Sequence, residues 1–272
     1  MVLVACISKL QNMPANFTFL KGSSPIVATA IHDGHRVRED LENLFNLSEA
    51  ERLREEDPFT ARWLQVTDNQ VVVHHSRFET DVNRPPDKAV YRLPEDAWGL
   101  KVWKNELPGE AAERSMQLYH DFYAAAKVYF DDLFSQHEQL VVYDIHSYNH
   151  QRAGAGTFAD PAANPEINLG TKNMDRELWE PVIEALGHHL RSFDYHGRSL
   201  DVRENIKFKG GYFGEWLYES YGRKVCVISI EFKKFFMNEW SGAPDEQEVQ
   251  LIAALMESSG QPVLEALKKV KP

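Results

Sequence analysis

The chain has 272 residues, of which 43% are hydrophobic and 26% are charged. These are ordinary proportions for a globular protein, and they exclude a collagen-like, coiled-coil or largely disordered chain. With 30 basic and 41 acidic residues the formal net charge is −11. This charge argues against binding to nucleic acid or to an anionic membrane surface, because both depend on positive charge.

The N-terminal half alternates short apolar runs with longer amphipathic stretches. The run at 25–31 predicts a strand, Ser48 is placed to cap a helix that continues through Glu56, and a second strand is expected at 70–74. The spacing of aromatic and aliphatic residues predicts a long helix at 110–136. Runs that are apolar nearly throughout are typical of strands covered on both faces, as in a parallel sheet.

The C-terminal half continues this alternation. Strands are expected at 140–145 and 225–230, and helices at 176–191 and 245–257. Gly260 should interrupt the last helix, and a short helix is expected to resume after it. The alternation of strands and helices predicts an α/β protein with helices on both faces of the sheet.

Residues 147–175 differ from the rest, because they are rich in Gly, Ala, Asn and Pro and show little periodicity. A connection of this length inside a compact domain is unusual and tends to line or cover a functional site. No linker or internal repeat divides the chain, so we expect residues 1–272 to form a single domain.

The cysteines and the N-terminal sequence indicate the cellular compartment in which we expect the protein. Cys6 and Cys226 lie in apolar runs, where buried free thiols are expected, and they are too few for a disulfide framework or a cysteine-rich zinc site. No run approaches the roughly 20 apolar residues of a membrane span, and the first residues lack the pattern of a signal peptide. We therefore expect a cytoplasmic protein.

The informative histidines follow predicted strands. His32 and His35 come after the first strand, and His146 comes at the end of the third, with Asp144 on the same face of that strand. Ligands bind at the carboxyl ends of strands in α/β sheets, and three protein ligands with an open position are common in catalytic zinc sites. The alternative is that these histidines are turn and strand-end residues with structural roles only.

Two further groups carry chemistry that such a site would use. Glu231 ends the last predicted strand, where partial burial raises the pKa of a carboxyl group towards that of a general base. Arg77 and Arg84 lie in the segment SRFETDVNRPP, and arginine binds carboxylates through two parallel hydrogen bonds. The structural alternatives are a glutamate paired with Lys233 or Lys234 and a solvated loop with surface ion pairs.

Six short segments occur in an order that is specific, although each alone is weak. They are PIVATAIHDGH, SRFETDVNRPP, VVYDIHSY, NLGT, FKGGY and ISIEF, spread over about residues 25–235. In this ordered set the chain resembles the N-formylglutamate amidohydrolase family, which in turn resembles the aspartoacylase and zinc carboxypeptidase superfamily. The resemblance implies a zinc-carboxypeptidase-like fold, with a single three-layer domain and a mixed, mostly parallel twisted sheet of about eight strands flanked by helices.

The resemblance also implies one zinc ion with His32 and His146 as ligands. The superfamily has a glutamate at the position of His35, so the second ligand is either His35, giving a site of three histidines, or an acidic residue such as Glu56 or Asp57. The ligand types favour zinc, although imidazole sites also accept cobalt, nickel or iron.

Other residues receive roles from the same resemblance. Glu231 corresponds to the general base, and Arg77 corresponds to the arginine that polarises the scissile carbonyl. The clamp for the substrate carboxylate corresponds to Asn83 and Arg84. The pocket is expected to be completed by Gly170, Thr171, Gly211 and Tyr212.

The implied activity is zinc-dependent hydrolysis of the formyl or short acyl amide of an acidic N-acyl amino acid, such as N-formylglutamate. Two alternatives remain open. One is a zinc carboxypeptidase-like enzyme or another N-acyl amino acid deacylase, which would share the same site residues. The other is a catalytically silent protein that binds an acidic metabolite. The expected partner is a small anionic acyl amino acid, with no nucleic acid and no membrane, and the oligomeric state stays open.

Overall fold

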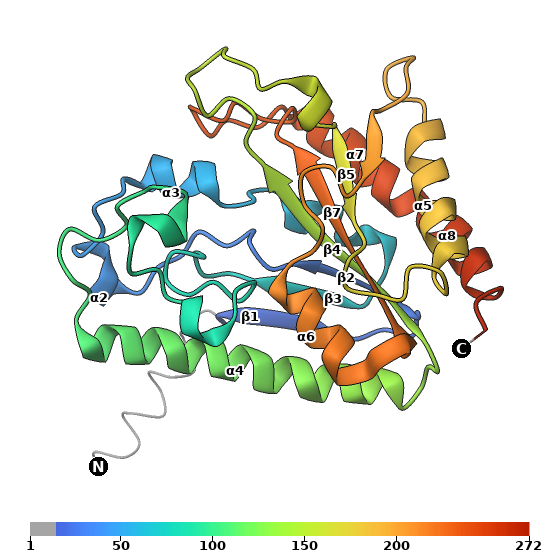
Figure 1. Cartoon of the computed structure of the whole chain (residues 1–272), viewed down its shortest axis with the longest axis horizontal. Helices are drawn as coiled ribbons and strands as arrows, with labels where there is room; N and C mark the ends of the chain where they lie inside the picture. The colour runs from blue at the N-terminus through green and yellow to red at the C-terminus, as the bar shows by residue number, and fades with distance from the viewer. Residues whose placement is uncertain (1–14, 272) are drawn as a thin grey trace.

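The computed structural model describes residues 15–271, which form one mixed sheet covered by helices on both faces (Figure 1). The strands are β1 Phe17–Leu20, β2 Ile26–Ala30, β3 Gln70–Val73, β4 Leu140–Tyr148, β5 Ile167–Gly170, β6 Val202–Glu204 and β7 Val225–Lys233. Their order across the sheet is β1-β3-β2-β4-β7-β5-β6. The four central strands β3, β2, β4 and β7 are parallel, β5 and β6 are parallel to each other, and antiparallel pairs join β1 to β3 and β5 to β7.

The described residues contain seven α-helices, five of which form two layers around this sheet. They are α2 Glu39–Glu42, α3 Glu49–Glu55, α4 Gly109–Phe134, α5 Glu180–Ser192, α6 Tyr212–Tyr221, α7 Glu246–Ser258 and α8 Gly260–Leu267. Helices α4 and α6 cover one face, and α5, α7 and α8 cover the other (Figure 1).

Alternate residues of the central strands supply two apolar cores. On β2, Val27 packs with α4 and α6, whereas Ile26 and Ala28 pack with the opposite helix layer. Because both faces are covered, the central strands are apolar nearly throughout, and this pattern made them recognisable in the sequence.

The main elements expected from the sequence are present. The four predicted strands and the predicted helices lie within a few residues of their expected ends. Ser48 caps α3 in a capping box with Glu51, and Asp245 caps α7. The expected α/β class, with a mixed and mostly parallel sheet flanked by helices, is confirmed. The described residues contain seven strands where about eight were expected.

Three strands and two helices were not predicted, and one of the two helices is the single turn α2. β1 and β6 are short strands at the two edges of the sheet, and β5 lies within the stretch 147–175 that we expected to be irregular. The longer of the two helices, α6, begins at the last residue of the FKGGY segment. The sequence of β5 is INLG, and Asn and Gly are depleted in strands. Pairing with β7 on one side and β6 on the other overrides this weak local preference.

Two smaller expectations have different outcomes. Cys226 is a buried free thiol in β7, whereas Cys6 lies outside the described residues. Within residues 15–271, no helix combines the length and the apolar character needed to cross a membrane.

The carboxyl ends of β2, β4 and β7 meet at one edge of the sheet. His32 follows β2 by two residues, and His146 on β4 lies directly opposite Glu231 on β7. Parallel pairing in register thus brings together side chains that are far apart in the sequence, and the candidate site lies at this edge.

Candidate functional site

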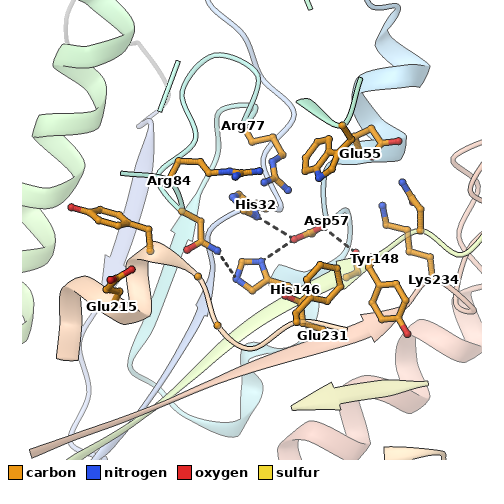
Figure 2. Close-up of a pocket in the computed structure, with 18 of the residues that line it drawn as sticks. His32, Glu55, Asp57, Arg77, Arg84, His146, Tyr148, Glu215, Glu231 and Lys234 are labelled. Atoms are coloured by element: carbon orange, nitrogen blue, oxygen red, sulfur yellow. Dashed lines mark hydrogen bonds and ion pairs between the residues drawn. The ribbon is translucent and has the colours of Figure 1, made fainter. Parts of the chain in front are cut away.

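A cavity of about 580 Å³ opens at this edge of the sheet (Figure 2). Most of the residues expected at the site line this cavity. Those expected residues are His32, Arg77, Asn83, Arg84, His146, Gly211, Tyr212 and Glu231.

Two imidazoles and one carboxylate converge at the floor of the cavity. Oδ2 of Asp57 lies 3.0 Å from Nδ1 of His146 and 3.4 Å from Nδ1 of His32. All three side chains are buried, and one ligand atom from each lies within 4.8 Å of the others. His32, Asp57 and His146 could therefore hold a metal ion.

Hydrogen bonds from two distant parts of the chain hold the segment that carries Asp57. His32 follows β2, and its carbonyl accepts a 2.9 Å hydrogen bond from the backbone N–H of Asp57, just after α3. The buried ammonium of Lys234 donates to the carbonyls of Arg54 and Glu56, at 2.6 Å each. The backbone of the segment that carries Asp57 is therefore held by His32 on one side and by the Lys234 side chain on the other.

A second carboxylate orients each imidazole. Nε2 of His32 donates to Asp81 at 2.7 Å, and Nε2 of His146 lies 3.0 Å from Asp144, which also accepts a hydrogen bond from Thr29. A hydrogen bond at one ring nitrogen fixes the tautomer and leaves the other nitrogen available to a metal. The Nδ1 atoms of His32 and His146 therefore both face Oδ2 of Asp57. The placement of Asp144 beside His146 follows the spacing of two residues seen in the sequence.

The buried charges around this point are mostly negative. Burial alone would raise the pKa of Asp57, but hydrogen bonds from His146 and His32 hold it well below its usual range. Burial likewise opposes ionisation of Asp81, and Arg77 and His32 hold its pKa well below the usual range. Burial would lower the pKa of His146, and Asp144 and Asp57 raise it well above normal. Buried ionised carboxylates need a compensating charge, which a divalent cation would supply.

The structure does not bring His35 into this group. Nδ1 of His35 pairs with the buried carboxylate of Glu56, and its Nε2 lies 3.4 Å from Glu49. The segment after His32 runs alongside the segment after β3, where Arg36 bridges to His75. This pairing turns His35 away from the cavity, and the third member of the group is Asp57, one of the two acidic residues considered from the sequence.

The arginines of the SRFETDVNRPP segment have different surroundings. Nε and Nη2 of Arg77 donate to Asp81 at 3.1 and 2.6 Å, and the guanidinium lies over the ring of Trp98 at 4.8 Å. Arg84 is partly exposed, and the nearest carboxylate oxygen, on Asp81, is 3.9 Å from its Nε. The guanidinium of Arg84 has no hydrogen-bonding partner among residues 15–271, so it is available to an anion in the cavity.

Asn83 connects the two sides of the cavity. Its amide oxygen accepts the backbone N–H of Phe213 at the start of α6, at 2.9 Å, and its Nδ2 lies 3.4 Å from Nε2 of His146. A Cβ atom on Gly211 would lie 2.3 Å from the Asn83 amide. Glycine at this position therefore lets the start of α6 approach the cavity.

Gly170 and Thr171 do not line the cavity, which corrects their expected placement. Gly170 ends β5, where a Cβ atom would lie 2.8 Å from the backbone of Lys209. The hydroxyl of Thr171 donates to Glu204, and its N–H donates to Asn205. Antiparallel pairing with β7 places β5 outside the cavity. Gly170 and Thr171 instead contact the segment that precedes Gly211.

Several residues with evident roles were not singled out from the sequence. Asp81 joins His32 to Arg77, and Asn149, Arg152 and Trp98 line the cavity. Asp81 lies inside the segment chosen for its arginines, so that segment was the available signal. Asn149, Arg152 and Trp98 belong to no sequence pattern that connects them with the histidines. They meet at the cavity only in the folded chain.

The fold is shared with solved structures of low sequence identity. One is an N-formylglutamate amidohydrolase from Ralstonia eutropha JMP134, with a TM-score of 0.74 and 16% identity, covering 94% of this chain and 100% of that chain. Another is a gene product of Agrobacterium tumefaciens, with a TM-score of 0.65 and 17% identity, covering 95% of this chain and 97% of that one. No curated protein matches the sequence significantly.

The family model described as N-formylglutamate amidohydrolase matches residues 24–237. This range includes every residue of the cavity floor and most of the chain. The chain therefore belongs to the N-formylglutamate amidohydrolase family.

The geometry predicts that one divalent cation binds at His32, Asp57 and His146. Replacing His146 with Ala should abolish stoichiometric zinc binding, because it removes one of three ligands. His35→Ala should retain the zinc, because His35 faces Glu56 instead. Elemental analysis after dialysis against zinc measures both variants. Zinc retained without His146, or lost only without His35, would contradict the assignment.

Asp81 should tune the affinity of that cation through His32. Asp81→Asn removes the carboxylate that orients the imidazole, and we expect a metal affinity roughly 10- to 100-fold lower, measured by competition with a chelator. Asp33→Asn is the control, since Asp33 is half-buried, accepts the N–H of Ala61 and has no side-chain hydrogen bond to His32 or His146 among residues 15–271. Equal affinities in the two variants would rule out this role.

Proposed function

We propose that the protein is a metal-dependent amidohydrolase that removes the formyl or a short acyl group from an acidic N-acyl amino acid such as N-formylglutamate. One observation carries the proposal. A group that could hold a metal ion, a partly buried carboxyl group and an arginine whose guanidinium has no hydrogen-bonding partner among residues 15–271 face the same cavity. Membership of the family supports the choice of reaction and substrate.

The donor set fits a catalytic metal site. Two imidazole nitrogens and one carboxylate oxygen are a common ligand set for zinc, with a further position left for water or substrate. When bound, such an ion lowers the pKa of water and polarises a carbonyl group. Zinc is the expected ion, and other divalent transition metals suit the same ligands.

Glu231 is the proposed general base. It lies opposite His146 in the β4–β7 ladder and lines the cavity. Burial raises the pKa of Glu231 to about 8, with His146 lowering it and Asp57 raising it. Glu231 takes a proton from water as the water oxygen bonds to the carbonyl carbon, and it delivers that proton to the amine nitrogen as the C–N bond breaks. Neutralising the neighbouring Asp57 with a cation would lower the pKa of Glu231 and favour its basic form.

The two arginines are proposed to hold different parts of the substrate. Arg77 is anchored through Nε and Nη2 to Asp81 and stacked on Trp98. Its Nη1 has no partner among the described residues, and we assign it to the carbonyl oxygen that becomes negative during attack. Arg84 is assigned to the carboxylate of the amino acid, beside the loop of Gly211.

Other assignments share part of this reasoning. A deacylase for larger acyl groups would use the same residues. A silent binding protein would need the arginines but no base, so the position of Glu231 beside the metal group favours an enzyme.

Glu231→Gln tests the base directly. The variant should bind zinc as the wild type does but hydrolyse N-formylglutamate roughly 100- to 10,000-fold more slowly, the usual loss when a general base is removed. Release of formate measures the rate, and elemental analysis measures the metal. A rate within a few-fold of wild type would show that another group takes the proton.

Arg84→Ala tests the carboxylate clamp. Losing a charge-assisted hydrogen bond should lower kcat/KM for N-formylglutamate roughly 10- to 100-fold, mainly through KM. The wild type should prefer N-formylglutamate to one of its two monoamides, and the variant should lose that preference. If the variant discriminates as the wild type does, Arg84 does not bind the carboxylate.

A further inference from the structure

The cavity extends beyond the metal group on the side away from Arg84. Figure 2 shows Arg84 and Glu215 to one side of His32, Asp57 and His146, with Tyr148 and Lys234 on the other. A substrate whose carboxylate binds Arg84 and whose amide carbon lies at the metal group would direct its acyl group into this second side. A formyl group, with a single carbon, would not reach into it.

An amide group without a partner follows Tyr148 in the chain and lines the cavity. Asn149 lines the cavity and is only 4% exposed. Its Oδ1 is buried without a hydrogen-bonding partner, and no residue in the described part of the chain bonds to its Nδ2. Buried polar side chains are nearly always hydrogen-bonded, so an unpaired amide that lines a cavity indicates a polar ligand. The Nδ2 group of Asn149 is the donor that an acceptor such as a carboxylate would use.

The charge on this side is positive. Lys234 is buried, donates only to two backbone carbonyls, and has no carboxylate within 4.0 Å among residues 15–271. Arg152 lies at the cavity lining, and Glu55 neutralises it through two hydrogen bonds of 3.2 and 2.6 Å. Lys207 lies beside the ring of Tyr148 but outside the cavity lining, and its ammonium donates to Asn164. This surplus favours an anionic group over a neutral one.

Aromatic side chains flank the polar groups. Trp98 and Phe208 both line the cavity and remain partly exposed. Exposed aromatic faces at a cavity can cover the methylene groups of a ligand and exclude water around its polar end.

We propose that Asn149, Arg152, Lys234, Trp98 and Phe208 form an acyl subsite, which binds an acyl group ending in a carboxylate. This inference rests on the proposed function and specifies its substrate class. The preferred substrates are N-acyl amino acids with a carboxylate at both ends, one bound by Arg84 and the other by the acyl subsite. N-formylglutamate can engage Arg84 through a carboxylate, and it leaves the acyl subsite unused.

A substrate series tests the acyl subsite. We would measure kcat/KM for glutamates carrying formyl, malonyl, succinyl or glutaryl groups, each of the last three beside its terminal carboxamide, which has the same shape but no charge. At least one of the three acids should exceed both its carboxamide and N-formylglutamate by about 10-fold or more. If N-formylglutamate is hydrolysed and no acid exceeds its carboxamide, the acyl subsite is wrong and the proposed function stands.

Binding separates the subsite from the chemistry. Calorimetric titration of the Glu231→Gln variant with each acid and its carboxamide gives Kd without turnover. One acid should bind at least about 10-fold more tightly than its carboxamide, and equal affinities throughout would overturn the proposal. If no acyl glutamate is hydrolysed by the wild type, the proposed function fails, and this titration still decides the subsite.

A matched pair of variants locates the preference. Arg152→Gln should reduce the ratio of acid to carboxamide at least several-fold. Arg198→Gln is the control, because Arg198 has a similar exposed fraction, 50% against 49%, and pairs with Glu166 in the same two-bonded way outside the cavity. A ratio unchanged in Arg152→Gln, or lowered equally in both variants, would overturn the assignment. Lys234 is not replaced, since its loss would leave two carbonyls beside Asp57 unpaired.

Discussion

The site depends on one buried carboxylate. Asp81 accepts hydrogen bonds from Nε2 of His32, from Arg77, from the hydroxyl of Tyr91 and from the backbone N–H of Asn83. It therefore fixes the tautomer of His32, the position of Arg77 and the backbone that carries Asn83 and Arg84. A single fully buried group relates these parts to one another, so their relative positions do not rely on flexible surface contacts.

The same arrangement has an electrostatic cost. Asp57, Asp81 and Asp144 are all buried within the reach of two imidazoles, and buried charges without compensation are unfavourable. A protein selected only for stability would have little reason to gather them. The excess of negative charge is reasonable if a cation completes the group. Burial is the main cause of the raised pKa of Glu231, and Asp57 and Asp144 add to it.

The sequence predicted the parts of the site that a strand end determines. His32, His146 and Glu231 each follow or end a buried parallel strand, so their meeting at one edge follows from the sheet alone. Asp57 could be considered only as one of two candidates, because it lies after α3 and reaches the cavity through backbone contacts with distant residues. Its position relative to His35 depends on how the chain turns after β2, which no local pattern specifies. The strand β5 was missed for a similar reason, since its neighbours in the sheet and not its own residues make it a strand.

Lys234 has a consequence for the order in which the protein is made. It holds the segment of Asp57 from a position just beyond β7, 178 residues after Glu56. During synthesis, His32, Asp57 and His146 emerge from the ribosome long before this clamp does. The complete centre can therefore assemble only when about six-sevenths of the chain has been translated. The order of translation thus places the contact that holds the segment of Asp57 among the last contacts of the site to form.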